Sequence, residues 1–535
     1  MKTTNQSSNG RQIAIIAMFF IFAMISFVTN LAAPIGTIWG YKFAGDSFLG
    51  MMGNMMNFAA YLFMGIPAGK LLVKIGYKKT ALYAMAVGVV GLFVQYLSSV
   101  IGADTVIYEK TITVTEKIGG ENVEMVRNFG VTLNFFIYLL GAFICGFCVC
   151  MLNTVVNPML NLLGGGGNKG NQLIQTGGAL NSLSATLTPF FVGALIGVLS
   201  PKTQMGDVAI LLWIAIAIFI AAFVIISFVA IPEPNKGSGS AKVKYLHSPW
   251  NFRHTVLGVI AIFFYVGIEI GIPGTLNFYL ADQNSTGAEV LGDASTIAGA
   301  VVAIYWLLML VGRALSSAIS GKISTRTQLL SVSVVGIVLT IAAICSPKSS
   351  RMDVPSFLYN PVESVQNTLS EANMPQTDID AFISNPTVEA LEQYTTSEQL
   401  VAKNGETVTR TVIANTNKQP YELVNALKST PTVPIAAIFL IICGLCTSVM
   451  WGGIFNLAVE GLGKYTAQAS GIFMMMVVGG GIMPLVQQKI AGAAGYMPSY
   501  WLIAGMLGYI LFYALIGCKN VNKDIPVDDE ITNSL

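Results

Sequence analysis

Long apolar runs separated by short polar loops make up most of the chain. A helix that crosses the hydrocarbon layer of a membrane needs roughly 20 mostly apolar residues, and twelve segments meet this requirement. We therefore expect twelve membrane-spanning helices. They cover residues 12–34, 48–72, 80–102, 131–162, 172–199 and 207–231 in the first part of the chain, and 255–281, 294–321, 328–346, 433–459, 466–490 and 497–518 in the second.

Three longer polar stretches interrupt this pattern. The stretch 232–254 contains two prolines and a Gly-Ser run, as flexible linkers do. We interpret it as a cytoplasmic linker between an N-terminal half, 1–231, and a C-terminal half, 255–535. The other two, residues 103–130 and 348–431, lie at equivalent positions in the two halves, on the outer face.

The insertions have strand signals of their own. Thr alternates with Val and Ile in 105–127 around a Gly-Gly pair, and the same alternation recurs in 400–413 around Asn404-Gly405. Both patterns predict β-hairpins. With a helical stretch at 378–394, the insertions are expected to form a small outer cap.

A short internal repeat supports the division into halves. Residues 144–148 (ICGFC) match residues 442–446 (ICGLC). Two halves related by an axis along the membrane normal are an architecture of secondary transporters. The predicted fold is an all-α membrane protein, with twelve transmembrane helices in two pseudo-symmetric six-helix halves and two outer-face insertions.

The composition excludes several classes of protein. The chain is 54% apolar and only 10% charged, whereas soluble domains carry charge on about a quarter of their residues. A soluble enzyme, a nucleic-acid-binding protein and a disordered chain are therefore excluded, and the net charge of +2 implies no polyanionic partner. The expected environment is a lipid bilayer.

Basic residues orient the spans. Cytoplasmic loops are enriched in Lys and Arg, and the basic loops of the twelve spans all fall on one face. We therefore expect a multi-pass protein of the inner (plasma) membrane with both termini cytoplasmic. The insertions carry fifteen acidic and nine basic residues, which makes the outer cap acidic.

The cysteines do not indicate a metal or redox site. Both CxxC strings lie inside apolar spans, and the only histidines, His247 and His254, lie in the linker. Small residues are common where membrane helices touch. We expect no metal and no cofactor. A membrane-embedded enzyme is disfavoured because no catalytic His, Ser or metal constellation is present.

Ionisable residues inside spans are costly and therefore candidates for function. Glu269 lies in the middle of the seventh span, just before Pro273, which breaks the helical hydrogen bonding, and Asn277 follows two turns later. The alternative is that Glu269 only fixes helix packing. Arg313, nearer the cytoplasmic end of the eighth span, is interpreted as a gating or structural residue.

Amides and aromatic residues recur inside the spans. Amides both donate and accept hydrogen bonds, which suits a polyhydroxylated neutral solute. Aromatic rings can stack on a sugar ring, although each alone is more often a packing residue. The candidates are Asn30, Asn153, Asn157, Gln175, Asn181 and Asn456, with Tyr265, Tyr305, Trp306 and Trp451.

Several motifs resemble a known family. Residues 69–79 (GKLLVKIGYKK) resemble the loop 2–3 signature of the major facilitator superfamily, G-x-L-x-D-R-x-G-R-K, with Val73 in place of its acid. Residues 152–158 (LNTVVNP) resemble the L-E-T-A-A-N-P segment of the fucose–proton symporter family. Residues 265–269 (YVGIE) and 457–466 (LAVEGLGKYT) are similar to its glucose/galactose branch. The residues expected to have a gating or structural role are Gly69, Lys74, Gly76 and Lys78, together with Arg313.

The resemblance implies import of a hexose-like sugar by alternating access, by a monomer. The acids that the fucose branch uses in helices 1 and 4 align with Ala33 and Asn153, which cannot take up a proton. Coupling is then to H⁺ through Glu269, to Na⁺, or absent. The alternatives are a peptide or drug transporter and a transporter-derived sugar sensor. The expected substrate-binding residues are Asn30, Asn153, Asn157, Asn181, Glu269, Asn277, Trp451 and Asn456.

Overall fold

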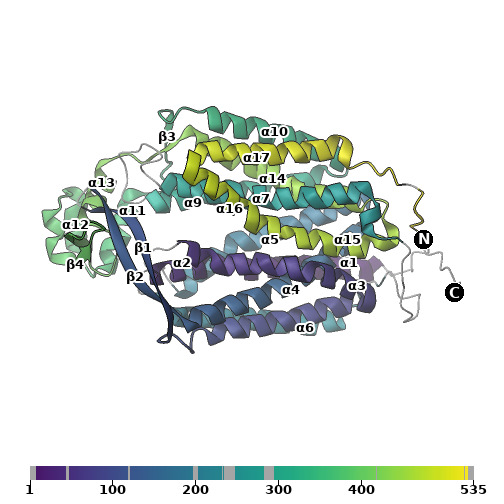
Figure 1. Ribbon diagram of the computed structural model, residues 1–535, viewed down its shortest axis with the longest axis horizontal. Coiled ribbons are helices and arrows are strands. Elements are labelled where there is room, and N and C mark those ends of the chain that lie inside the picture. The colour runs from purple at the N-terminus through teal and green to yellow at the C-terminus, as the bar shows by residue number, and fades with distance from the viewer. Residues whose placement is uncertain are drawn as a thin grey trace.

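The computed structural model is an elongated bundle of long helices (Figure 1). Strands and short helices cover one end, called the cap end here. α1 begins at the opposite end, called the termini end. The structure describes residues 8–43, 47–118, 121–196, 203–231, 233, 247–281, 294–416, 418–522 and 524–527.

The N-terminal half of the bundle consists of α1 to α6, and α1 is followed directly by the short α2. Apolar side chains on most faces of these helices favour burial within the bundle or in lipid. The bounds are α1 Ser8–Asn30, α2 Ala32–Lys42, α3 Ser47–Leu97, α4 Leu133–Gly164, α5 Gly167–Ile196, η1 Met205–Val208 and α6 Ala209–Phe228.

The C-terminal half consists of the helices from α7 onwards, apart from those of the cap. Its eleventh predicted span is divided by a 3₁₀ turn into α15 and α16. The bounds are η2 Pro249–Asn251, α7 Arg253–Ala281, α9 Ala294–Ile319, α10 Thr325–Cys345, α14 Ile435–Val459, η4 Gly463–Tyr465, α15 Thr466–Met475, η5 Met476–Val478, α16 Gly479–Ala494, α17 Tyr496–Phe512 and the π-helical η6 Tyr513–Gly517.

Ten segments of the described chain are long and apolar enough to span a membrane. One of them, Met52–Leu97, lies in α3, which is interrupted at Gly76 (φ 85°) and corresponds to the second and third predicted spans. α5 is 30 residues long but is not among the ten. The count of twelve spans, the division at 232–254 and the domain boundaries stay predictions; most of the linker lies outside the described residues.

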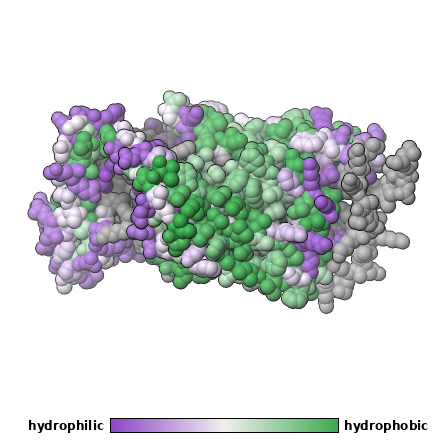
Figure 2. All heavy atoms as spheres, turned by 60° about the horizontal axis from the view of Figure 1, so that its bottom comes forward, coloured by the Kyte–Doolittle hydropathy of each residue, from purple (hydrophilic) through white to green (hydrophobic). Residues whose placement is uncertain are grey.

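The surface supports a membrane environment. A broad apolar surface covers the helical part of the molecule, whereas the cap end is polar (Figure 2). Large side chains on this surface include Phe63, Phe191 and Phe228, which are 63%, 52% and 86% exposed. Exposed apolar area of this extent is rare on soluble monomers, and lipid would cover it.

The first insertion forms the predicted hairpin. β1 (Val106–Ile118) pairs antiparallel with β2 (Glu121–Thr132), and β2 runs directly into α4. The Gly-Gly pair of the expected turn, residues 119–120, lies outside the described residues.

The second insertion folds as a small cap with its own core. The 400–413 hairpin is confirmed, with Gly405 at φ 87° in its turn. The expected helix at 378–394 is two elements, α12 and η3. The bounds are β3 Arg351–Asp353, α11 Pro361–Glu371, α12 Gln376–Ser384, η3 Glu389–Tyr394, β4 Thr395–Val401, β5 Thr407–Ile413, α13 Pro420–Lys428 and β6 Thr432–Pro434.

The hairpin and the cap touch, although they are inserted into different halves. Met125 on β2 forms an antiparallel bridge with Ala402. The Lys403 amide donates to the Glu124 carbonyl at 2.7 Å, and the two side chains form an ion pair at 2.8 Å. Both side chains are more than half exposed, so the ion pair adds little stability. This contact connects the two halves at the cap end.

The separate core of the cap can be tested with Leu369→Ala. Leu369 is fully buried in α11 among Val365, Ile379 and Phe382. Truncating a buried Leu costs about 2–5 kcal/mol, a large fraction of the stability of a small unit. We expect limited proteolysis of the purified protein to cut within 348–431 much faster in this variant. Val362→Ala, on the exposed face of the same helix, is the control, and equal cutting of both variants would contradict a separate cap core.

Candidate functional site

A cavity of about 210 Å³ lies between the two halves, in the middle of the bundle. Helices α1, α3, α4 and α5 of one half and α7, α9 and α14 of the other contribute its walls. Its polar lining consists of Ser26, Thr29, Asn30, Tyr61, Asn153, Gln175, Asn181, Ser182, Tyr265, Glu269, Trp306, Arg313 and Trp451.

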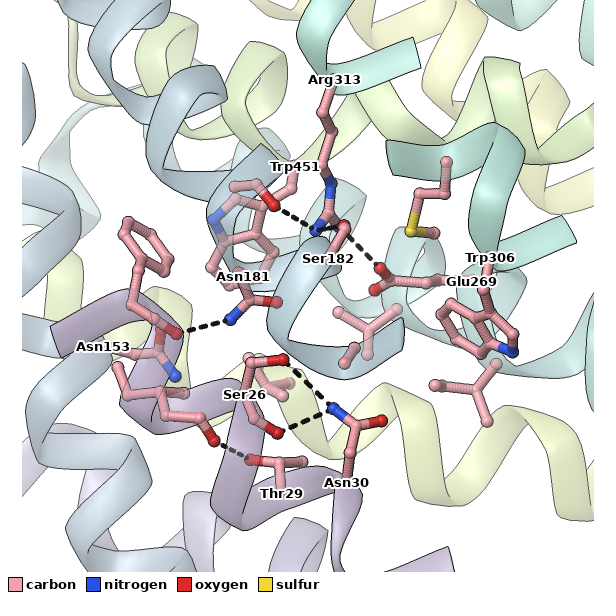
Figure 3. A pocket seen from close by; sticks show the side chains of 18 of the residues that line it. Ser26, Thr29, Asn30, Asn153, Asn181, Ser182, Glu269, Trp306, Arg313 and Trp451 are labelled. Carbon is pink, nitrogen blue, oxygen red and sulfur yellow. Dashed lines mark hydrogen bonds and ion pairs between the residues drawn. The ribbon is translucent and has the colours of Figure 1, made fainter. Parts of the chain in front are cut away.

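Among the described residues that line this cavity, only Glu269 and Arg313 are charged. A guanidinium nitrogen of Arg313 lies 3.0 Å from the Glu269 carboxylate, and the side chains are 10% and 16% exposed, respectively. They point toward each other from α9 and α7 (Figure 3). Neither charge is stable alone in this environment, since burying an unpaired ion is far more costly than burying a bonded pair.

The guanidinium of Arg313 also forms hydrogen bonds with the other half. Its second terminal nitrogen donates to the carbonyl of Gly178 at 3.1 Å and to the Ser182 hydroxyl at 2.7 Å, both on α5. Arg313 therefore contacts the cavity, its acidic partner and the opposite half at once. From the sequence, Arg313 was expected to be a gating or structural residue and not part of the cavity wall.

Pro273 shapes the backbone beside Glu269. Proline has no amide hydrogen, so the carbonyl four residues earlier loses its helical donor; here that carbonyl belongs to Glu269 itself. The Tyr305 hydroxyl donates to it at 3.3 Å and also bonds Thr447 at 2.9 Å. Tyr305 thus ties α7 to α9 and α14 next to the ion pair.

Three of the predicted amides line the opposite wall. Through their side-chain nitrogens, Asn30 donates to the Ser26 carbonyl at 2.8 Å, Asn153 to the Tyr61 hydroxyl at 3.1 Å, and Asn181 to the Phe22 carbonyl at 3.1 Å. Within the described chain no donor reaches their side-chain oxygens. These oxygens are free to accept hydrogen bonds from a ligand.

Trp451 joins the wall from α14. Its indole nitrogen donates to the side-chain oxygen of Asn157 at 3.1 Å. Asn157 is fully buried and does not line the cavity. From its position outside the lining, Asn157 fixes the orientation of the Trp451 ring through this hydrogen bond.

Two further predicted residues also lie away from the cavity lining, Asn277 and Asn456. Asn277 is on the last two turns of α7, toward the cap end. Asn456 is buried near the termini end, where it accepts from Asn161 at 2.7 Å. The structure thus places Asn30, Asn153, Asn181, Glu269 and Trp451 at one cavity, and Asn157, Asn277 and Asn456 outside its lining.

Neutral hydrogen bonds between the halves close the cavity on the side of the termini end. Gln175 donates to the Val449 carbonyl at 3.0 Å, Asn171 to Ser320 at 2.9 Å, and Ser470 to the Thr154 carbonyl at 3.1 Å. The Thr154 carbonyl is available because Pro158 removes its helical donor. Toward the cap end, hydrogen bonds between described residues of the two halves are confined to the hairpin and the cap.

Comparisons with known proteins find relatives over the whole chain. The glucose/galactose transporter of Brucella abortus is 25% identical over 529 residues, covering 97% of each chain. The L-fucose-proton symporter of Escherichia coli is 31% identical over 78 residues, 15% of this chain and 18% of the symporter. No family model matches the chain.

A solved structure has the same arrangement of helices. The crystal structure of the major facilitator superfamily transporter FucP in the outward conformation matches with a TM-score of 0.63 at 15% identity, covering 95% of this chain and 99% of FucP. The chain therefore has the fold of this transporter. The predicted resemblance to the fucose–proton symporter family and its glucose/galactose branch is confirmed.

The superfamily signature at residues 69–79 forms a turn within α3. Gly76 adopts φ 85°, and the Tyr77 and Lys78 amides after it donate to the Glu233 carboxylate at 2.9 and 3.0 Å. The Lys78 ammonium donates to the carbonyls of Ser227 and Val229. This turn is therefore anchored to the end of α6. Lys74 is exposed, and the gating role of these residues stays a prediction.

Other lining residues gave no usable signal in the sequence. Ser26, Thr29, Gly178 and Ser182 are small residues of a kind found throughout membrane helices. Their spacing does not reveal that α1 and α5 turn these positions toward the cavity. The cysteines are free, and no group of His, Cys, Asp and Glu that could hold a metal occurs among the described residues.

A glycine seam brings the backbones of α3 and α15, from different halves, into contact. A Cβ atom at Gly471 of α15 would lie 2.5 Å from the carbonyl oxygen of Gly65 and 2.7 Å from the Cα of Gly69, both on α3. Backbone atoms cannot move aside without separating the two helices. Gly69, predicted for gating, is thus a packing position between the halves.

Gly471→Ala tests this seam. Overpacking costs typically about 1–3 kcal/mol, so the melting temperature of the purified protein should fall. Gly492→Ala on α16 is the control, since no atom lies within 4 Å of its Cβ position; helix propensity should leave that variant equal or slightly more stable. A melting temperature for Gly471→Ala equal to that of the control would show that the seam tolerates a methyl group.

Proposed function

We propose that the chain is a secondary transporter that imports a neutral hexose-like sugar across the plasma membrane by alternating access. The observation that supports this most is the cavity between the halves, with amide oxygens on one wall, two tryptophans and a single ion pair. The full-length relative of Brucella abortus is named a glucose/galactose transporter, and another relative an L-fucose-proton symporter.

The lining chemistry suits a sugar better than a lipophilic drug. The free oxygens of Asn30, Asn153 and Asn181 accept from hydroxyl groups, and the carboxylate of Glu269 adds a charged acceptor. Trp451 and Trp306 offer the apolar ring faces on which a pyranose stacks. A peptide would need separate charged sites for its two termini, and the cavity lining holds one ion pair already bonded to itself.

We propose that the termini end faces the cytoplasm, in keeping with the basic loops. The structure is then outward-facing, because the seal of neutral hydrogen bonds lies on the cytoplasmic side of the cavity. Alternation breaks this seal and closes the cap end. One chain supplies every cavity wall, so a monomer is sufficient for transport.

Coupling is assigned to H⁺ through Glu269. Its side chain is the only carboxylate among the described lining residues, and the positions of the family's other acids are Ala33 and Asn153, which do not titrate. A proton taken up by Glu269 from outside and released inside would drive accumulation. Na⁺ coupling would need a set of oxygen ligands around an ion, and the Glu269 carboxylate is instead bonded to Arg313.

Counterflow of a radiolabelled sugar panel in proteoliposomes tests the assignment. Glucose, galactose and fucose should exchange, at least one of them with high affinity, and an imposed pH gradient should drive accumulation without Na⁺. A protein that binds a sugar but shows no counterflow would be a sensor. Accumulation that requires Na⁺ and ignores the pH gradient would overturn proton coupling.

Glu269→Gln separates coupling from translocation. The amide keeps the size and hydrogen bonds of the side chain but cannot carry a proton, so accumulation under a pH gradient should be lost while counterflow persists. Glu363→Gln, on the exposed face of α11 in the cap, is the matched control and should accumulate sugar normally. Normal accumulation in Glu269→Gln would remove Glu269 from the coupling step.

A further inference from the structure

Arg313 begins a series of contacts between α9 and α5 that runs from the cavity to the termini end. At the cavity it donates to Gly178 and Ser182. Closer to the termini end, Ser317 bonds Thr176 at 2.7 Å, and beyond that Ser320 bonds Asn171. Among these contacts, only the first contains a charge.

The surface of α5 is shaped to receive this side chain. A Cβ atom at Gly178 would lie 3.3 Å from the Cδ of Arg313, tighter than ordinary packing. Glycine therefore lets the guanidinium lie close against α5 and reach both the Gly178 carbonyl and Ser182 (Figure 3).

The guanidinium keeps this position because Glu269 balances its charge. The groups that face the pair are neutral: the Ser182 hydroxyl from α5, the Tyr265 phenol from α7 and the Tyr305 phenol from α9. In the part of the chain that the structure describes, no second acid lines the cavity. When Glu269 is protonated, Arg313 becomes a buried cation without a counter-charge, an arrangement that is strongly unfavourable until water reaches it.

We propose that Arg313 is the positioning residue through which the charge of Glu269 controls the seal at the termini end. With Glu269 ionised, Arg313 holds α9 against α5 and the seal is closed. With Glu269 neutral, the closed state contains an unbalanced guanidinium, and separation of α9 from α5 lets water hydrate it. Release of the proton to the cytoplasm restores the pair and the closed seal.

This inference rests on the proposed function for the direction of transport, but its test needs no sugar. Spin labels replace Lys169 and Lys322, exposed residues near the termini end of α5 and just after α9. Cys345→Ser provides the background, because the other six cysteines are buried. The distance between the labels is measured in nanodiscs by double electron–electron resonance as the pH is lowered.

We expect a short distance at high pH and a longer distance at low pH. Glu269→Gln should populate the longer distance severalfold more than the parent protein at high pH and respond no further to pH. Arg313→Gln should remove the pH response, and combining the two substitutions should abolish the effect of Glu269→Gln. A Glu269→Gln variant that keeps the short distance, or an Arg313→Gln variant with the parent's pH response, would overturn the proposal.

Three further variants, one of them a control, distinguish loss of the latch from misfolding. Arg313→Lys keeps the positive charge but replaces the forked guanidinium with one ammonium group, which bonds α5 less firmly. The distance between the labels should therefore still respond to pH, but the long-distance population at high pH should be larger than in the parent. Gly178→Ala crowds Arg313 and should raise the long-distance population at high pH, whereas Gly299→Ala on α9, with no atom within 4 Å of its Cβ position, should match the parent. Equal behaviour of the two alanine variants would count against a latch at Gly178.

The two hypotheses fail separately. If no sugar shows counterflow but the distance still responds to pH through Glu269 and Arg313, the latch stands and the substrate is wrong. If sugar accumulates under a pH gradient while the distance ignores Arg313→Gln, the transport function stands and the latch is wrong.

Discussion

The geometry of the cavity depends on one buried ion pair. Glu269 and Arg313 are nearly excluded from water, and each makes the other tolerable in an apolar interior. Because the guanidinium also bonds α5, the pair fixes three helices from both halves around the same point. The other polar contacts across the interface are amides and hydroxyls, whose net contributions are individually small. The closed interface therefore combines many weak contacts with a single strong one, and the proposed proton switch acts on that one.

Prolines place free carbonyls beside the functional side chains in both halves. Pro273 exposes the carbonyl of Glu269, which Tyr305 caps. Pro158 exposes the carbonyl of Thr154, adjacent to Asn153, and Ser470 from the opposite half caps it. A free backbone acceptor inside a membrane must be satisfied, so each proline recruits a hydroxyl from a neighbouring helix. The helix breaks thereby tie together the walls on which the candidate residues stand.

The sequence predicted the chemistry of the site better than its geometry. Glu269 stood out because so little else within the spans is ionisable. The amides of α1, α4 and α5 stood out because they can both donate and accept hydrogen bonds. Periodicity along one helix could not show that Asn157 lies behind Trp451, or that Asn456 lies in the seal. Both depend on how the helices are rotated against one another. Gly178 and Ser182 were unpredictable because their role comes from the partner that crosses to them.

The length of the apolar runs also predicted the membrane-spanning helices only in part. α5 was predicted as a span from its length, yet Asn171, Gln175 and Asn181 make it less apolar than its neighbours. These amides face the interface and the cavity, so polarity within α5 reflects its position between the halves. Gly76, in contrast, joins two predicted spans with an anchored turn that the loop motif indicated. In this bundle, polar residues within an apolar helix mark the face that contacts the other half.

The contact between the hairpin and the cap is weak, as alternation between the two halves requires. Two halves that alternate must separate at one end while they close at the other, and a strong bond at the mouth would oppose that motion. The contact between the hairpin and the cap consists of a β-bridge, a backbone hydrogen bond and an exposed ion pair. Exposed pairs contribute about 0–1 kcal/mol, so this contact can be remade at little cost. The strong interaction lies instead at the centre, at the two residues that are proposed to respond to a proton.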